Sequence, residues 1–183
     1  MVILVDMDDT IEALLDAWLK KLNKKYGRNV SREEIVSWDT SSAFPGLTKS
    51  DVYGVLLEND FWKEVEPIPG AADALRYFKS KGHEVCIVTA THYRSLFGKM
   101  EYLLFRYFPF ITWDDVIITS RKQMIKGDVL IDDGVHNLIG GDYKKILVDA
   151  PYNRDFDAEA NGMIRVCNWD QIKAAVDAME ETE

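Results

Sequence analysis

Short runs of β-branched and aliphatic residues recur along the chain, and stretches with helical spacing separate them. Four runs predict buried parallel strands, namely VILVD (2–6), EVCIVT (84–89), DVLID (128–132) and KILVD (145–149). A fifth run, DVIIT (115–119), predicts a strand at an edge of the sheet. Strands that alternate with helices are typical of an α/β fold with a parallel sheet. We therefore expect a three-layer, Rossmann-like fold in which helices cover a parallel sheet.

The stretches between these runs carry signals for where helices begin and end. Apolar residues recur at helical spacing from Ile11 to Tyr26, and Gly27 stands where such a helix would end. The same kinds of signal predict further helices over 69–82, 93–108 and 168–181.

The stretch between the first and second predicted strands is too long for a single crossover helix. Within it, SREEIVSW (31–38) and TKSDVYGVLLEN (48–59) predict additional helices. We interpret this stretch as a small helical cap that is inserted after the first strand and lies above the sheet. The predicted division is a cap at 16–66 and a core formed by 1–15 and 67–183.

Composition excludes some classes of partner. The chain has 183 residues and a net charge of −9. Phosphate backbones and anionic membranes are bound mainly by Lys and Arg, so we expect neither a nucleic-acid polymer nor a membrane as a partner. No stretch approaches the ~20 apolar residues that a membrane span needs. Cys86 and Cys167 both lie in strand-like runs, which predicts free, buried thiols and a cytoplasmic location.

Three residues at the ends of predicted strands are candidates for a reactive site. These residues are Asp6, Thr89 and Asp132, and Asp133 follows at once. In an open parallel sheet, ligands bind at the carboxyl ends of the strands. Neighbouring strands lie ~4.8 Å apart, so side chains from three such ends can surround one small ion or phosphoryl group.

The carboxylates at this edge suit phosphoryl-transfer chemistry. Like charges repel unless a cation lies between them, and Asp6, Asp132 and Asp133 offer the hard oxygen ligands that suit Mg²⁺ beside a phosphate. A carboxylate held next to such an ion can attack phosphorus and form an acyl phosphate. A second carboxyl group, Asp8, can protonate the leaving oxygen and later deprotonate water.

The equatorial oxygens of a phosphoryl group also need hydrogen-bond donors, because negative charge must be stabilised there. The Thr89 hydroxyl is one candidate. Lys122 and Lys126, which come just before the strand that ends on Asp132, are two candidates for a second donor, and the spacing favours Lys122.

The segments DMDDT (6–10), VTA (88–90), Lys122 and LIDDG (130–134) resemble, in that order, the motifs of the haloacid dehalogenase-like (HAD-like) phosphohydrolase superfamily. The resemblance implies a HAD-like core that uses Mg²⁺ as its cofactor. It implies the following roles: Asp6 as nucleophile, Asp8 as acid and base, Thr89, Ala90 and Lys122 as phosphoryl-binding residues, and Asp6, Asp8, Asp132 and Asp133 around the metal, with Asp133 as the favoured direct ligand.

Within that superfamily, DFWKEVEPIPGAADAL (60–75) resembles the 5′(3′)-deoxyribonucleotidases and their bacterial relatives. This resemblance implies a substrate pocket that includes Phe61, Trp62, Leu14 and Trp18. A second interpretation stays open for Phe61 and Trp62, which could instead pack at the hinge between cap and core. Trp18 could likewise be a core residue, since aromatic residues at helical spacing usually are.

One residue departs from the superfamily pattern. Glycine usually follows the acid/base Asp, whereas this chain has Asp9. Aspartate tolerates a left-handed backbone better than most residues, so we expect the turn to be kept. Two interpretations, site or scaffold, also stay open for Trp38, Phe44, Tyr53, His92, Arg94, Asn153 and Arg154.

The leading hypothesis is a Mg²⁺-dependent phosphomonoester hydrolase, specifically a 5′(3′)-nucleotidase that forms an aspartyl phosphate. Its substrate would be a small phosphomonoester, and the sequence leaves open whether the protein is a homodimer. One alternative is a phosphatase or phosphotransferase of the same fold that acts on sugar phosphates or other small phosphoesters. A remote alternative is a phospho-accepting receiver-like domain, although the order of the acidic residues and the inserted cap are evidence against it.

Overall fold

A single parallel sheet forms the centre of the protein. The computed structural model describes residues 1–181, apart from the side chain of Asn59. The sheet has six strands in the order β3-β2-β1-β4-β5-β6, and every neighbouring pair is parallel. The strands are β1 (Val2–Val5), β2 (Glu84–Thr89), β3 (Val116–Ile118), β4 (Val129–Asp132), β5 (Lys144–Val148) and β6 (Met163–Val166).

The five predicted strands are confirmed, and β3 lies at an edge as expected. The strand β6 was not predicted as part of the sheet. It has four residues, lies at the other edge of the sheet and pairs on one side only, with β5. The two cysteines are free, but the prediction that they are buried is wrong. Cys86 is half-buried, and Cys167 is exposed because it lies just beyond the end of β6.

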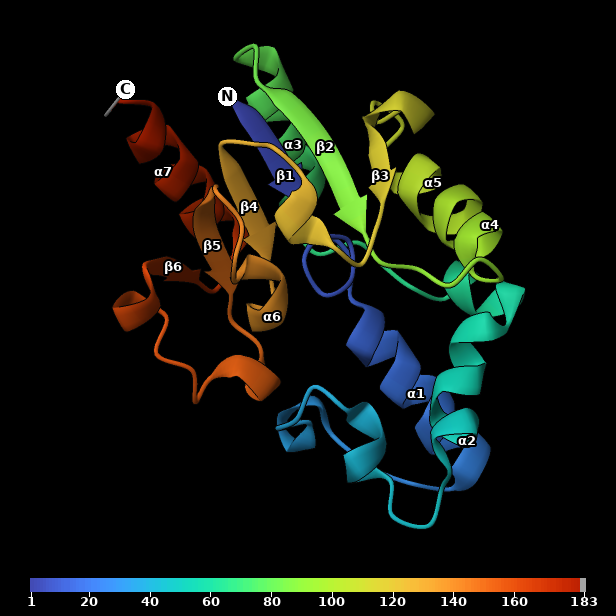
Figure 1. Cartoon of the computed structure of the whole chain (residues 1–183). Helices are drawn as coiled ribbons and strands as arrows, with labels where there is room; N and C mark the ends of the chain where they lie inside the picture. Colours follow the sequence, from blue (N-terminus) through green and yellow to red (C-terminus); the bar gives the residue numbers. More distant parts are fainter. Residues whose placement is uncertain (182–183) are drawn as a thin grey trace.

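Side chains that alternate along the strands build a core on each face of the sheet. Ile3 and Val5 of β1 belong to the larger cluster, which the helices α3 (Ala71–Ser80) and α7 (Trp169–Glu180) cover. Leu4 belongs to a smaller cluster, which includes Leu138 of the short helix α6 (Val135–Leu138). The predicted three-layer α/β architecture is therefore confirmed (Figure 1).

A further helical stretch flanks the edge strand β3. It consists of α4 (Leu96–Gly98), the π-helical segment η5 (Lys99–Leu104) and α5 (Phe105–Tyr107), which together correspond to the helix predicted over 93–108. The π-helical turn changes which side chains face inward relative to a regular α-helix, and such turns are frequent at functional sites.

The chain between β1 and α3 forms a group of helices next to the carboxyl ends of the strands (Figure 1). The first of them, α1 (Leu14–Tyr26), ends at Gly27, whose left-handed φ of 61° closes the helix as the sequence predicted. The remaining elements are η1 (Arg32–Glu34), η2 (Thr40–Ala43), α2 (Lys49–Tyr53), η3 (Gly54–Leu57) and η4 (Asn59–Lys63). Among the described residues, no helix has both the length and the apolar character required to cross a membrane.

Candidate active site

Three carboxylates meet where β1 and β4 end. Asp6 continues β1, and its backbone N–H donates to the carbonyl of Ile131 at 2.9 Å. Asp132 is the last residue of the neighbouring β4, and Asp133 follows. Ligand oxygens of these three buried aspartates lie within 4.8 Å of one another. The strand register therefore produces the cluster that was predicted from the strand ends.

The three carboxylates differ in the number of hydrogen bonds that their oxygens accept. Asp132 accepts from Lys122 Nζ at 2.6 Å, from Gly134 N at 2.7 Å and from Asn137 Nδ2 at 3.0 Å. Asp133 accepts from the Tyr152 hydroxyl through one oxygen, while its buried Oδ1 has no partner. Since a buried polar atom normally has a partner, Asp133 Oδ1 is the oxygen best placed to bind a cation. The set as a whole fits a hard divalent ion such as Mg²⁺.

Lys122, at the start of η7 (Lys122–Met124), is the lysine that enters this cluster. Its Nζ lies 2.5 Å from Asp6 Oδ1 as well as 2.6 Å from Asp132, and the residue is 1% exposed. Burial on its own disfavours the ammonium ion, but these two carboxylates raise the pKa of Lys122 above its ordinary value. Lys126 instead lines a separate hollow near Val2.

Burial and crowding change the titration of the acidic groups. Burial raises the pKa of Asp6 to about 7, although the Lys122 ammonium opposes the shift and Asp132 adds to it. Burial, followed by the charges of Asp132 and Asp6, raises the pKa of Asp133 well above its ordinary value. A cation between these groups would favour their ionised forms.

Asp8 has a separate partner, which the sequence analysis missed. Lys99 Nζ lies 2.7 Å from the Asp8 carboxylate and 2.9 Å from Thr89 Oγ1, and the residue is 1% exposed. Burial alone would raise the pKa of Asp8, but the Lys99 ammonium is the main group that brings the pKa below its ordinary value. The available signal was a lysine four residues before Leu103 on the buried side of a predicted helix.

Asp9 keeps the turn that glycine usually makes. Its φ of 50° is left-handed, as predicted, and it is the one non-glycine residue with positive φ in the described part of the chain. Its Oδ2 accepts from the N–H of Leu15 at 3.1 Å, which pairs one of the donors left free at the beginning of α1.

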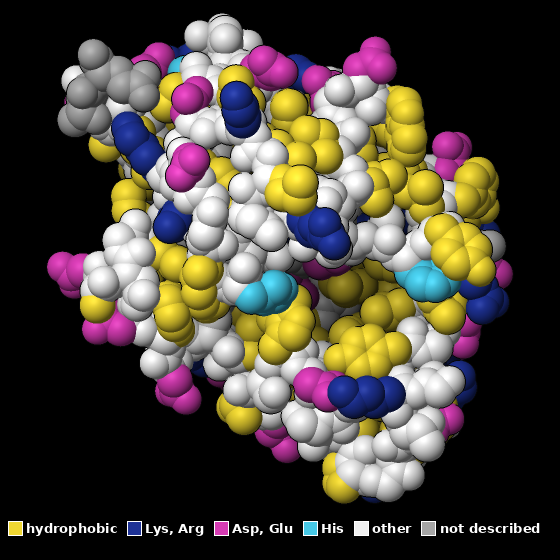
Figure 2. All heavy atoms as spheres, in the orientation of Figure 1, with side chains coloured by type: hydrophobic (Ala, Val, Ile, Leu, Met, Phe, Trp, Pro, Cys, Tyr) yellow, Lys and Arg dark blue, Asp and Glu magenta, His cyan; other side chains and the backbone are white. Residues whose placement is uncertain are grey.

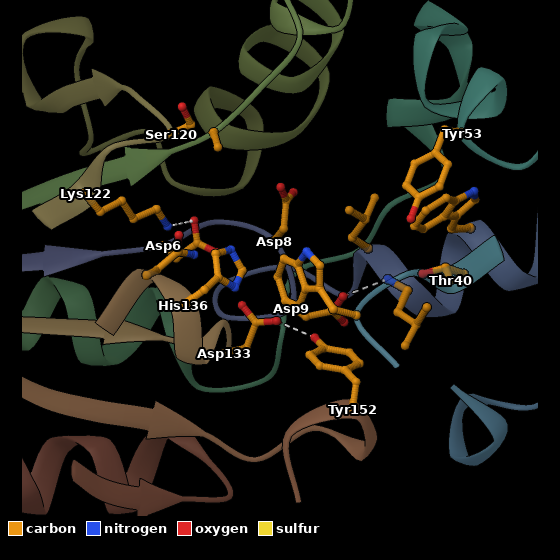
Figure 3. A pocket seen from close by; sticks show the side chains of 16 residues that line it. Asp6, Asp8, Asp9, Thr40, Tyr53, Ser120, Lys122, Asp133, His136 and Tyr152 are labelled. Carbon is orange, nitrogen blue, oxygen red and sulfur yellow. Dashed lines mark hydrogen bonds and ion pairs between the residues drawn. The ribbon is translucent and has the colours of Figure 1, made fainter. Parts of the chain in front are cut away.

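A cavity of about 330 Å³ opens above the carboxylates (Figure 3). Asp6, Asp8, Lys122 and Asp133 lie at one end of it, and aromatic, aliphatic and some polar side chains from the helical insertion and from the rest of the chain line the remainder. Figure 2 shows it as a hollow near the centre of this face, with acidic side chains at its floor. The insertion contributes Trp18, Trp38, Thr40 and Tyr53, and the other lining residues are Asp9, Leu14, Leu15, Ala90, Ser120, His136, Asn137 and Tyr152.

A second cavity of about 370 Å³ adjoins the first and shares Asp8, Leu14, Tyr53 and Ala90 with it. Trp62 lines this second cavity beside Lys99, whose Nζ lies 5.4 Å from the centre of the indole ring.

The proposed pocket residues do not all reach a cavity. Leu14, Trp18 and Trp62 do, whereas the fully buried Phe61 lines neither and packs edge-on against Trp62, with ring centres 5.3 Å apart. For some of the residues that the sequence left open between site and scaffold, the structure gives an answer. Trp38, Tyr53 and His92 line a cavity, whereas Phe44 is buried and lines neither. Asn153 supports the loop after β4, because its side-chain amide donates to the Asp133 carbonyl at 2.9 Å.

Comparisons with known proteins agree with this geometry. The model of the family described as 5′ nucleotidase, deoxy (Pyrimidine), cytosolic type C protein matches residues 1–180. A 5′(3′)-deoxyribonucleotidase from Bacillus subtilis (strain 168) is 35% identical over 94% of this chain and 96% of its own length. A second from Clostridium acetobutylicum is 29% identical over 97% of this chain and 95% of its own length.

The solved structures show the same fold at lower identity. A HAD family hydrolase from Deinococcus radiodurans R1, crystallised with bound phosphate and sodium, superposes with a TM-score of 0.58 at 18% identity. The match covers 96% of this chain and 94% of that chain, which confirms the HAD-like fold.

Proposed function

Because this chain belongs to the 5′(3′)-deoxyribonucleotidase family of HAD-like phosphatases, we propose that it hydrolyses (deoxy)nucleoside 5′- or 3′-monophosphates with Mg²⁺ and through an aspartyl phosphate. The observation that carries this proposal is the meeting of Asp6 with Asp132, Asp133 and Lys122 at the floor of a cavity whose other walls include several aromatic and aliphatic side chains. That arrangement offers one end for a phosphoryl group and another for a nucleoside.

Asp6, Asp132 and Asp133 are the residues that would hold Mg²⁺. The bound ion would offset the repulsion among the carboxylates and draw negative charge from the phosphoryl oxygens. Lys122 would donate to an oxygen of the same phosphoryl group, because its ammonium already bridges Asp6 and Asp132.

The chemistry proposed for Asp6 and Asp8 has two steps. In the first, an Asp6 oxygen attacks phosphorus, the bond from phosphorus to the nucleoside oxygen breaks, and Asp8 supplies the proton to that oxygen. In the second, Asp8 takes a proton from water, the water oxygen attacks phosphorus, and the bond between Asp6 and phosphorus breaks. The lowered pKa of Asp8 keeps the group ionised at neutral pH, which is the form that accepts a proton from water in the second step.

The helical insertion supports the choice of a nucleoside as the rest of the substrate. We propose that residues 16–66 form a cap and that residues 1–15 and 67–183 form the catalytic core. The cap supplies Trp18, Trp38 and Tyr53 to the first cavity, and Trp62 lines the second. Aromatic faces stack on nucleobases, with a stacking contribution of about 1–3 kcal/mol per base.

Release of inorganic phosphate from a panel of substrates tests the proposal. The panel contains 5′- and 3′-monophosphates of deoxyribonucleosides and ribonucleosides, several sugar phosphates and glycerol 2-phosphate, each assayed with Mg²⁺ and with excess chelator. We expect the highest kcat/KM for a nucleoside monophosphate and no turnover in chelator. A sugar phosphate as the best substrate would contradict the nucleotidase proposal, and full turnover in chelator would contradict the metal assignment.

A further inference from the structure

A salt bridge connects the loop that carries Asp8 to the cap. Arg32, in η1, donates from Nη1 to Asp9 Oδ1 at 2.9 Å and to Asp16 Oδ1 at 3.2 Å. Asp9 is 8% exposed and Arg32 is half-buried, so water screens this pair less than it screens a pair on the open surface. Asp9 is also the residue that replaces the usual glycine, and it directly follows Asp8.

The chain that follows Arg32 contacts residues outside the cap that also line the first cavity. We call residues 32–40 the bridging segment. Its Glu33 pairs with Arg154 of the core. Its Trp38 packs edge-on against His136, with ring centres 4.4 Å apart, and against Tyr152, at 5.4 Å. The Tyr152 hydroxyl in turn donates to the Asp133 carboxylate.

Little apolar burial holds the middle of the bridging segment. Ile35 and Thr40 are buried, but Val36 is 71% exposed and Trp38 is 55% exposed. Burial of apolar surface is the main force that fixes an element on a core. The position of Trp38 over the cavity therefore depends on the ion pairs and on the two ring contacts.

We propose that Asp9 and Arg32 are positioning residues that fix the bridging segment over the phosphoryl site, so that Trp38 forms a wall of the substrate cavity. The inference rests on the proposed function, since the wall would contact the nucleoside and not the phosphoryl group. Loss of the pair leaves Asp6, Asp8 and Lys122 in place. It therefore weakens binding of a nucleotide and has little effect on a small phosphoester that does not reach the wall.

Steady-state kinetics of Arg32→Ala, Arg32→Lys and Asp9→Asn test this role, with a nucleoside 5′-monophosphate and glycerol 2-phosphate as substrates. For Arg32→Ala we expect KM for the nucleotide to rise about tenfold, equivalent to about 1.4 kcal/mol, with kcat changed less than about twofold. Arg32→Lys keeps the charge and should recover about half of the loss on a logarithmic scale. Asp9→Asn keeps a residue that tolerates the left-handed turn, and it provides a second variant if Arg32→Ala does not fold.

Arg28→Ala is the matched control. Arg28 lies in the cap four residues before Arg32, is exposed, and donates to the carbonyl of Pro45 within the cap. This variant should leave both substrates unaffected.

Amide hydrogen exchange without substrate provides an independent measurement. Exchange in residues 32–40 should be about tenfold faster in Arg32→Ala than in the unmodified protein, and unchanged in Arg28→Ala. Unchanged exchange together with an unchanged KM in Arg32→Ala and Asp9→Asn would overturn the inference. Faster exchange with equal losses for both substrates would also overturn it, because the pair would then not act on the nucleoside wall. If the unmodified protein hydrolyses no nucleoside monophosphate, the proposed function fails, and the exchange rates alone decide whether Arg32 fixes the segment.

Discussion

Replacing Lys99 by Met tests how much the contacts of Lys99 with Asp8 and Thr89 contribute to the stability of the fold. Methionine keeps most of the volume of the side chain and removes the charge and the hydrogen-bond donors of the ammonium group, so that no large cavity forms. The change leaves the Asp8 carboxylate without its ammonium partner at 2.7 Å and leaves Thr89 Oγ1 without its donor at 2.9 Å.

The structure bounds the size of the effect. Removing one partner of a buried ion pair costs about 3–5 kcal/mol, and a hydrogen bond to a charged group contributes about 1.5–3 kcal/mol. The Asp8 side chain is 30% exposed, so water partly solvates it and the lower end applies. We expect the free energy of unfolding at pH 7 to fall by about 2–3 kcal/mol, which for a chain of this length lowers Tm by roughly 5–10 °C.

The effect has a defined pH dependence. The folded protein holds the pKa of Asp8 below its ordinary value, so this group contributes stability that is present above the unfolded pKa and is lost as the pH falls through the folded pKa. The variant lacks the largest contribution that opposes the effect of burial, so the pKa of Asp8 is higher in the variant than in the unmodified protein. The difference in Tm between the two proteins should therefore be largest at neutral pH and become smaller toward pH ~4.

Thermal denaturation followed by circular dichroism between pH 4.5 and pH 8 measures this difference. Lys20→Met, which removes an exposed lysine of α1, is the control and should leave Tm nearly unchanged. A Tm difference for Lys99→Met that is below about 2 °C at pH 7, or that does not vary with pH, would refute the assigned role of Lys99.

Four further expectations concern the proposed chemistry. Asp6→Asn should lower kcat by several orders of magnitude, because an amide is a poor nucleophile; retention of more than about one per cent of the phosphate release would exclude Asp6 as the nucleophile. Asp8→Asn should slow a natural nucleotide far more than p-nitrophenyl phosphate, whose leaving group needs no proton, and equal losses would contradict the role of Asp8 as an acid. Trp62→Ala should lower kcat/KM for a nucleoside monophosphate roughly five- to hundredfold more than for glycerol 2-phosphate; a ratio near one with a lower Tm would make Trp62 a packing residue. Burial raises the pKa of Asp6 to about 7 and that of Asp133 well above its ordinary value. Without metal, the contribution of these groups to stability is complete below their unfolded pKa and is lost as the pH rises through the raised values. Mg²⁺ should therefore raise Tm more at pH 8 than at pH 5.5, and an equal shift would contradict binding at these carboxylates.

The parallel sheet and the acidic cluster were predictable from the sequence, because both depend on patterns that are local in the chain. Runs of β-branched residues between helical stretches predict parallel strands. Parallel strands place their carboxyl ends at one edge, so Asp6, Asp132 and Asp133 were expected at the same edge, and the adjacency of β1 and β4 in the sheet then brings them together. The left-handed turn at Asp9 and the end of α1 at Gly27 are also local, because each depends on the backbone preference of a single residue.

Contacts between distant segments were decided only by the tertiary structure. Lys99 lies 91 positions from Asp8 along the chain, and although its helical spacing indicates a buried position, no local pattern indicates that Asp8 is its partner. Phe61 and Trp62 are adjacent and both buried, yet only Trp62 lines a cavity. Side-chain direction relative to a cavity depends on how the cap packs on the core, and that packing is the sum of many weak contacts between segments far apart in the chain. For the same reason, the pairing of Arg32 with Asp9 was not predictable, because 23 positions of the chain separate the two residues.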